Sequence, residues 1–388
     1  MCATNPSKES RWEQSATSNE WIEHFSLLPD PRTGNRTEQG HRDHRTNSDD
    51  LRSGWMGRKR TIREVAARMV RPIPGTTARH SVPYVWPRLF LLSPQAFEQV
   101  FRAWTQSLHQ ASQGTIVAID GKTSRGSHDR LHEQNLLHLV SAWASENGVV
   151  LAQRSIDEKF NEIKAIPKLL DDLMLKGYIV MIDAMGCQKD IVEKIREREA
   201  DYVIGLKGNQ PRLQEDVQVF FDDARQIEFR DIPHEYCKTA EKGHGRLEIR
   251  RYWLCPAATS IPQDHAWRDL NGIGMVEAER HVQDQVTTER RYYICSFDKN
   301  VYEFARAVRG HWGIENSLHW VLDMAFREDQ LRVRLNHAAE NAAVLRHIAL
   351  NLLKQESTAK CGIAAKQKMC GWDHDYLLKV LSLAAKNV

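Results

Sequence analysis

Two aspartates follow short apolar runs in a pattern that places carboxylates at one edge of a sheet. Asp120 ends the run TIVAID over 115–120, and Asp183 ends the run YIVMID over 178–183. In open α/β sheets, ligands bind outside the carboxyl ends of the strands, so acids there indicate a binding or catalytic site. A lone aspartate after a strand is also a common turn residue or helix cap. Two such aspartates, each followed by Gly or Ala, favour a binding or catalytic role over a role in a turn or cap.

A third acid, Glu315, lies in RGHWGIENSLHWVLD, where His311, Glu315 and His319 recur every four residues on one helix face. We expect no zinc site there, because the spacing differs from H-E-x-x-H and the two histidines would lie about 12 Å apart along the axis. Three carboxylates from two strands and one helix suit Mg²⁺, which prefers oxygen ligands. Two such ions, about 4 Å apart, can activate a nucleophile and stabilise the leaving oxygen in phosphoryl transfer.

Sequence motifs of several other enzyme classes are incomplete or absent. Gly121, Lys122 and Thr123 are similar to the end of a phosphate-binding P-loop, but Ile116 occupies the position of its first glycine. The sequence contains no G-x-S-x-G nucleophile elbow and no G-x-G-x-x-G motif after a strand. ATP-dependent and NAD-dependent activities therefore have no support.

The elements expected around the three acids form a mixed α/β core. Residues 228–298 are rich in β-branched and aromatic residues, which predicts an antiparallel insert. A helix is expected to begin near Pro94, where apolar periodicity returns. Periodicity further predicts strands at 115–120, 136–145, 149–157, 178–183 and 201–206, and helices at 161–175, 188–198, 301–326, 336–354 and 375–386.

Composition narrows the class of protein and of partner. The 388 residues contain no run of 18 apolar residues and no apolar signal core, so no membrane partner and a cytoplasmic location are expected. The seven cysteines are scattered without a C-x-x-C motif, which favours reduced thiols. Residues 36–88 carry a net charge of +7 by count, although the whole chain carries only +3. This basic block indicates a polyanion partner or, alternatively, a solvated polar stretch.

The chain resembles the H-repeat-associated transposases, insertion-sequence proteins of the DDE superfamily. The motifs that carry the resemblance are IDGKTSRGS, IDAMGCQK, LKGNQP, EKGHGRLEIRR and RGHWGIENSLHWVLDMAFRED, with a further match at HFSLLPDPR. The resemblance runs from about Leu91 to the C-terminus. It implies an RNase H-like mixed sheet with helices on both faces and an antiparallel insert before the last acid. It also implies metal-dependent cleavage and joining of DNA, a homo-oligomer on element ends and target DNA, and association with the bacterial nucleoid.

The resemblance also assigns residues. Asp120, Asp183 and Glu315 become the catalytic and metal-binding triad, with Asp120 bridging two Mg²⁺ ions, for which Mn²⁺ is a substitute, and each other acid holding one. Polar and aromatic positions that resemble groups lining such sites are expected to bind DNA or, alternatively, to be solvated or packed: Lys122, Lys207, Asn209, His244, Arg246, Arg309 and Trp312. The Tyr-Arg-Glu-Lys signature of some relatives is not carried over, because His311 and Leu322 replace its Arg and Lys.

The resemblance implies an accessory region over 1–94, a catalytic core over 95–355 that includes the insert, and a tail with a short helix over 356–388. Residues 35–88 depart from it, because relatives have apolar, helix-forming sequence where this chain is rich in Arg, His and Pro. Such sequence predicts poor packing, and we interpret it as a frameshifted stretch between two compensating insertions or deletions. A degraded accessory region leaves two alternatives open: an inactive remnant that at most binds DNA non-specifically, and a metal-dependent nuclease of the same fold.

Overall fold

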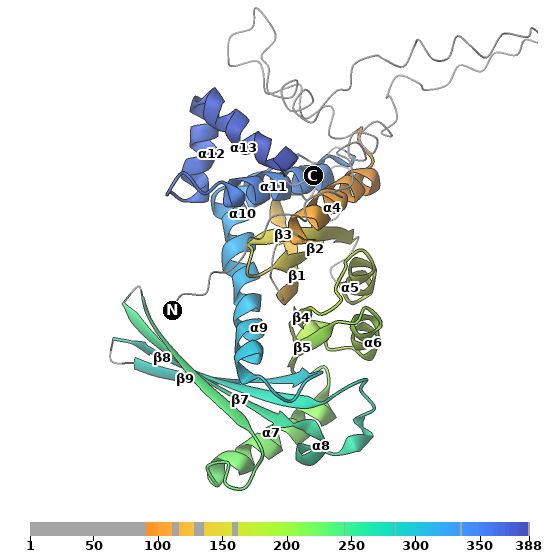
Figure 1. Ribbon diagram of the computed structural model, residues 1–388, viewed down its shortest axis with the longest axis vertical. Helices are drawn as coiled ribbons and strands as arrows, with labels where there is room; N and C mark the ends of the chain where they lie inside the picture. The colour runs from red at the N-terminus through yellow and green to blue at the C-terminus, as the bar shows by residue number, and fades with distance from the viewer. Residues whose placement is uncertain are drawn as a thin grey trace, which may run out of the picture. The chain divides into compact units, whose positions relative to one another are not determined.

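The structure is a computed structural model that describes residues 91–110, 116–127, 136–156, 162–243, 245–283, 285–333 and 336–386. The expected features of 1–90, including the basic block and the proposed frameshift, lie outside the described residues, as does His244. The described residues form a nine-stranded mixed sheet with helices packed against it (Figure 1). This arrangement confirms the predicted α/β class.

The first five strands make the core of the sheet, in the order β3-β2-β1-β4-β5. β1 pairs antiparallel with β2 and parallel with β4, and β4 pairs parallel with β5. This mixture confirms the mixed sheet expected of an RNase H-like core. The bounds of these strands are β1 (Ile116–Ser124), β2 (Leu137–Ala144), β3 (Val149–Ile156), β4 (Ile179–Ile182) and β5 (Asp201–Leu206).

Two details of the core strands refine the predictions. The expected β2–β3 hairpin is present, and Gly148 adopts a positive φ of 64° in its turn, where a side chain would be strained. The prediction that β1 ends at Asp120 was wrong. β1 continues to Ser124, because the residues after Ile119 remain paired with β2 although their parallel pairing with β4 has ended.

Helices cover the core sheet. Figure 1 shows α9 on one side of β4 and β5 and α5 and α6 on the other. Among the helices longer than four residues, α7 and α12 were not predicted, so residues 356–388 carry two helices where the sequence indicated one. No helix among the described residues combines the length and the apolar character needed to cross a membrane. The helices longer than four residues are α4 (Pro94–Gln110), α5 (Glu162–Asp171), α6 (Lys189–Glu197), α7 (Pro211–Gln226), α9 (Val301–Ile314), α10 (Trp320–Met324), α11 (Ala338–Gln355), α12 (Ile363–Trp372) and α13 (His374–Lys386).

The insert is antiparallel, as predicted, but it does not form a separate sheet. β9 pairs antiparallel with β5, so the insert extends the core sheet in the order β9-β8-β7-β6. The far end of β9 carries exposed residues, and the far end of β8 carries half-buried and exposed ones. The insert strands are β6 (Glu235–Gly243), β7 (Arg246–Pro256), β8 (Gly272–Val282) and β9 (Gln285–Cys295).

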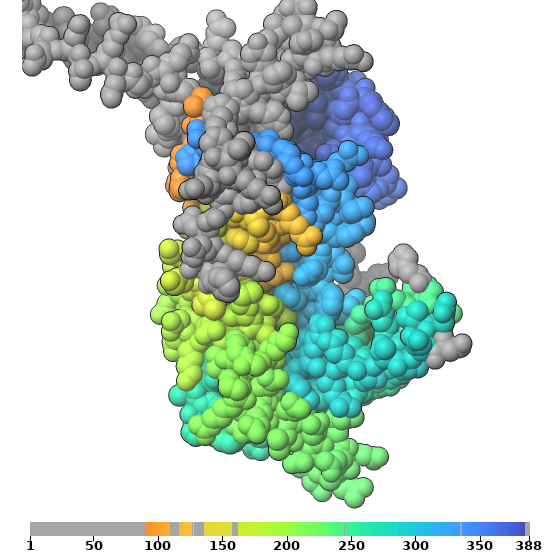
Figure 2. Space-filling view, turned by 180° about the vertical axis from the view of Figure 1, so that it is seen from behind, coloured from red at the N-terminus to blue at the C-terminus, as the bar shows by residue number. Residues whose placement is uncertain are grey.

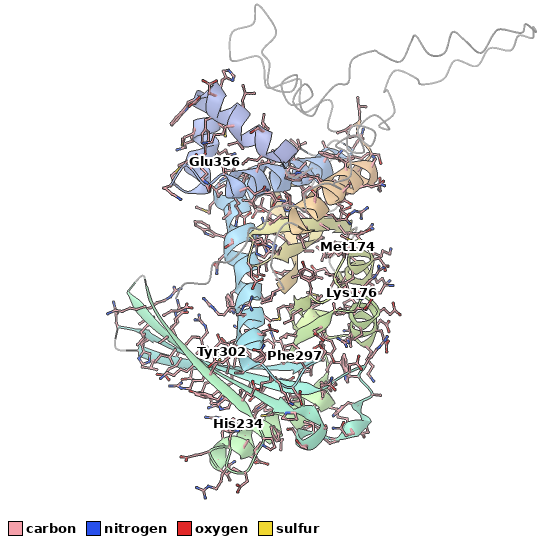
Figure 3. All side chains as sticks on the ribbon, viewed as in Figure 1. Met174, Lys176, His234, Phe297, Tyr302 and Glu356 are labelled. Atoms are coloured by element: carbon pink, nitrogen blue, oxygen red, sulfur yellow. The ribbon has the colours of Figure 1, made fainter. Side chains whose placement is uncertain are left out.

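One buried apolar cluster joins the core, the insert and α9. It includes Met181 of β4, Tyr252 of β7 and Phe304 of α9, and Phe297, between β9 and α9, packs against it (Figure 3). Gly274 of β8 admits the Phe304 ring, because a Cβ there would lie 2.4 Å from it. Figure 2 shows light-blue residues of α9 between the yellow-green core and the cyan insert. The helix that leads to Glu315 is thus fixed against both parts of the sheet.

Candidate active site

Asp120 and Asp183 are neighbours by strand register. Ile119 of β1 pairs with Ile182 of β4, and this is the last pair of their parallel ladder. Each aspartate is the residue that directly follows this pair, so the two lie side by side at the carboxyl end of the parallel strands. This is the edge at which the sequence pattern predicts a ligand site.

Asp183 also caps a short helix. Its Oδ1 accepts hydrogen bonds from the backbone N–H of Met185 at 3.0 Å and of Gly186 at 3.4 Å, at the start of the 3₁₀ helix η5 (Ala184–Gly186). Asn209 donates from Nδ2 to the Ala184 carbonyl at 2.7 Å and so ties the loop after β5 to this turn. The capping and site interpretations of Asp183 are therefore compatible, and Asn209 supports the turn that orients its carboxylate.

Glu315 reaches the site from α9. At Glu315 the helix widens into one π-helical turn, η7 (Glu315–His319), in which the Trp320 N–H bonds to the Glu315 carbonyl five residues earlier. Five residues before Glu315, Gly310 packs closely against β1, because a Cβ there would lie 3.2 Å from Ile116 and 2.8 Å from Ser145 Oγ. π-Helical turns inside α-helices occur frequently at functional sites.

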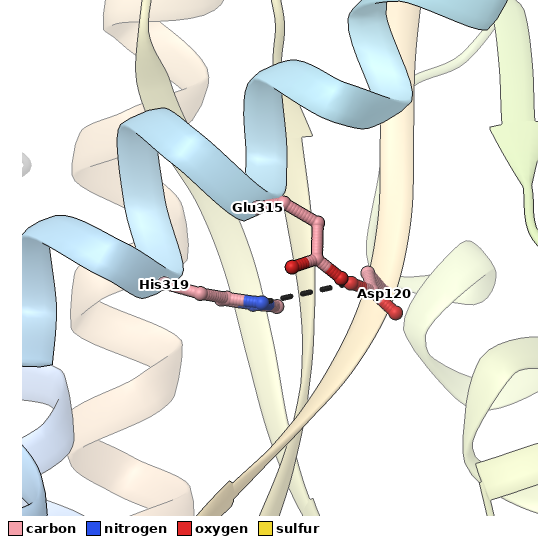
Figure 4. Close-up of side chains that lie close together, drawn as sticks. All are labelled: Asp120, Glu315 and His319. Atoms are coloured by element: carbon pink, nitrogen blue, oxygen red, sulfur yellow. Dashed lines mark ion pairs between the residues drawn. The ribbon is translucent and has the colours of Figure 1, made fainter. Parts of the chain in front are cut away.

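Three side chains converge on one point, as Figure 4 shows. One ligand atom each of Asp120, Glu315 and His319 lies within 4.8 Å of the others. The Oδ2 atom of Asp120 is buried and has no hydrogen-bond partner in the described part of the chain. Burial, followed by the nearby charges of Glu315 and Asp183, raises the pKa of Asp120 to about 8. A bound cation would pair the buried Oδ2 atom and offset the repulsion among the carboxylates. The donors present therefore fit a divalent metal ion.

The sequence arguments missed His319 as a site residue. They excluded a zinc ion shared with His311, and His311 is indeed not among the three converging side chains. The spacing of four residues between Glu315 and His319 was the available signal, since such residues share a helix face. What could not be read from the sequence was the π-helical turn between them.

Lys122 lies two residues beyond Asp120 on β1, but its charge is already paired. Its Nζ donates to Asp323 Oδ1 at 2.5 Å and to Glu328 Oε2 at 2.6 Å, and Arg346 also contacts Glu328 at 3.2 Å. Burial disfavours the Lys122 ammonium, but the two carboxylates outweigh it and raise the pKa of Lys122. Lys122 therefore connects β1 to the segment after α10.

Three of the other residues that were predicted to bind DNA lie in two places, after β5 and on α9. Lys207 is exposed directly after β5, close in sequence to Asn209. Arg309 and Trp312 belong to α9 and face the insert, where Arg309 donates to Glu241 at 3.0 Å and the Arg291 guanidinium lies 4.9 Å from the centre of the Trp312 ring. The structure thus brings Arg309 and Trp312 together with the insert and leaves Lys207 at the strand ends.

A groove of about 540 Å³ lies between the insert and α9. Asn316, the residue after Glu315, and the half-exposed Trp312 contribute to its wall. Its charged lining alternates in sign and consists of Glu241, Arg246, Glu248, Arg250, Glu279, Arg280, Glu289, Arg291 and Arg309.

The comparisons with known proteins identify the family of the chain. Residues 111–352 match the family described as transposase DDE domain. The chain belongs to this family. The H repeat-associated protein YhhI of Escherichia coli K12 is 37% identical to this DDE transposase over 298 residues, 75% of this chain and 78% of YhhI. YncI of Escherichia coli O157:H7 is 40% identical over 291 residues, 74% of each chain.

Both relatives are named as transposases, which confirms the predicted family. The cryo-EM structure of the piggyBac transposase synaptic complex with hairpin DNA is also similar. The similarity covers 71% of this chain and 54% of that chain, with a TM-score of 0.34 and 8% identity. DDE transposases generally use a divalent metal, in agreement with the donors around Asp120.

Proposed function

We propose that this DDE transposase hydrolyses the phosphodiester bond at the ends of an insertion-sequence-like element and joins the freed 3′-hydroxyl to target DNA. The observation that supports this best is the approach of Glu315 to Asp120, within 4.8 Å, at the strand ends where Asp183 is next in register. Carboxylates gathered from two strands and one helix are the ligands that Mg²⁺ prefers.

The three acids divide the work of holding metal. Asp120 lies beside both other acids and is proposed to contact two Mg²⁺ ions, for which Mn²⁺ substitutes, while Asp183 and Glu315 each hold one. Such ions, when bound, supply an activated water or hydroxyl nucleophile and stabilise the leaving oxygen. The turn capped by Asp183 and the packing of α9 on β1 keep the carboxylates in place. No side chain is required to form a covalent intermediate.

The groove beside Glu315 supports DNA as the partner. Arginine side chains contact phosphates, and aromatic rings such as Trp312 stack on bases. We propose that element-end DNA lies along this groove, contacted by Arg246, Arg309 and Trp312 and by His244, which comes between β6 and β7 in the sequence, with Lys207 near the strand ends. We further propose a homo-oligomer on DNA, in the cytoplasm and at the nucleoid.

The proposed division of the chain remains that of the sequence: an accessory region over 1–94, the catalytic core over 95–355 and a tail over 356–388. The core contains every converging side chain of the site. The rival, an inactive remnant, is favoured by the loss of apolar periodicity over 35–88. The coding DNA across codons 33–92 tests the frameshift, because family text in the +1 frame should be found there.

Cleavage of DNA that carries the element ends tests the function. We expect Asp120→Asn and Glu315→Gln to abolish cleavage in Mg²⁺ and to leave the fold intact, because an amide keeps the shape of the side chain but not its charge. Glu303→Gln, on the same helix as Glu315, is the matched control and should cut like the wild type. Undiminished cleavage by Asp120→Asn would overturn the assignment.

The same assay separates the alternatives. A transposase cuts element ends and joins them to a second DNA. A nuclease of the same fold cuts without joining, and a remnant binds DNA without cutting. Scoring cleaved and joined products on one gel therefore decides among the three.

A further inference from the structure

His319 is a buried histidine whose ring lacks ordinary partners. It is 8% exposed and ends the π-helical turn that Glu315 begins. Its Nε2 is buried and makes no hydrogen bond in the described part of the chain. Most buried side-chain polar atoms are paired, so a buried imidazole nitrogen without a partner needs an explanation.

The other ring nitrogen faces the carboxylate of the site. His319 Nδ1 lies 3.5 Å from Asp120 Oδ2, and this oxygen also has no hydrogen-bond partner among the described residues. Two buried atoms that can both donate lone pairs thus face each other. Adjacent donors around one Mg²⁺-sized ion, each about 2.1 Å from it, lie about 3 Å apart. The space between these atoms therefore suits a cation after a small adjustment.

The backbone accounts for the convergence. Glu315 and His319 are four residues apart on one helix, and the wider π-helical turn between them lets both side chains approach Asp120 on β1. Asp183 is held by its own cap and is not among the three atoms that meet within 4.8 Å. The convergence is thus a feature of β1 and η7.

We propose that His319 is a nitrogen ligand of the divalent cation that Asp120 and Glu315 hold. The proposal rests on the proposed function, because it requires a metal at Asp120. It adds a ligand that the three acids do not supply. Since imidazole favours first-row transition metals and Mg²⁺ favours oxygen, His319 should shift the preference of the site toward Mn²⁺.

Electron paramagnetic resonance of bound Mn²⁺ tests the proposal without any need for activity. The full chain, labelled with ¹⁵N-histidine or left unlabelled, is loaded with Mn²⁺, and the electron spin echo reports a histidine nitrogen bonded to the ion. We expect this coupling in the wild type and in His311→Gln, the matched control one helical turn before Glu315. We expect His319→Gln to lose it and to bind Mn²⁺ roughly tenfold more weakly.

A second variant covers the case in which His319→Gln folds poorly. His319→Asp offers an oxygen ligand instead, so it should bind Mn²⁺ without the nitrogen coupling and should bind Mg²⁺ relatively more tightly in competition. The proposal is wrong if the coupling survives in both His319 variants, or if the wild type shows none although Asp120→Asn abolishes Mn²⁺ binding. If Asp120→Asn leaves Mn²⁺ binding unchanged, the proposed function itself fails.

Discussion

Lys122 Nζ lies 2.6 Å from Oε2 of Glu328, a carboxylate that is 1% exposed and 206 residues away in the sequence. Asp120 and Lys122 are two residues apart on β1, so their side chains share one face of the sheet. The ion pair between Lys122 and Glu328 therefore anchors the chain after α10 to β1, the strand that carries the first acid of the site.

Removing the carboxylate of Glu328 should destabilise the protein strongly. Glu328→Gln leaves the buried charges of Lys122 and Arg346 short of a partner, which costs about 3–5 kcal/mol of unfolding free energy. Asp323→Asn is the control, because Asp323 contacts the same lysine but its side chain is 35% exposed, and its loss should cost about 1 kcal/mol or less. Urea unfolding measures both, and equal losses would contradict the role given to burial.

Glu98 should make the stability depend on pH. Burial raises the pKa of Glu98 from 4.5 to about 7, so between these values the folded chain holds a proton that the unfolded chain releases. Stability therefore falls as the pH rises from about 4.5 to about 7. Glu98→Gln should remove this part of the slope and be more stable than the wild type at pH 8. Thermal unfolding at several pH values, with Glu215→Gln at an exposed position as control, checks this prediction. Equal dependence of stability on pH in the wild type and in Glu98→Gln would refute it.

Arg246 should contribute to DNA binding through phosphate. Arg246→Ala is expected to weaken binding to all DNA sequences alike and to reduce the slope of log K against log salt by about 0.9. Arg268→Ala is a close control, because both arginines are 41% exposed and each pairs with a glutamate, at 2.8 and 2.7 Å respectively. Arg268 does not line the groove. Fluorescence anisotropy at several salt concentrations distinguishes the two, and an unchanged slope for Arg246→Ala would place the DNA elsewhere.

Local patterns in the sequence predict the neighbouring placement of Asp120 and Asp183. The apolar runs before Asp120 and Asp183 predict two buried strands, and strand register then brings the acids together. His319 escaped because its approach to Asp120 depends on a π-helical turn, for which the local sequence has no recognised signal. The ion pair of Lys122 with Glu328 joins positions that are distant in the sequence, and such pairs are visible only after folding.

The same reasoning applies to the fold. The antiparallel character of the insert follows from the β-branched and aromatic residues of β7 and β9, but their pairing with β5 is a long-range contact. α12 was missed because its apolar residues do not gather on one face. Packing against α11 and α13 holds it instead, and this packing is not encoded within its ten residues.

Gly310 should be required for the approach of α9 to β1, and hence of Glu315 to Asp120. A methyl group at Gly310 would lie 2.8 Å from Ser145 Oγ and 3.2 Å from Ile116 Cγ2. Gly310→Ala should therefore lower the unfolding free energy by about 1–3 kcal/mol, as overpacking does, and weaken Mn²⁺ binding by displacing Glu315. Gly313→Ala is the matched control on the same helix, because its Cβ would meet only Trp143 Nε1, at 3.8 Å. It should gain up to about 1 kcal/mol from helix propensity. Chemical unfolding and Mn²⁺ titration measure both variants, and a Gly310→Ala protein as stable and as tightly metal-bound as Gly313→Ala would show that the close approach is dispensable.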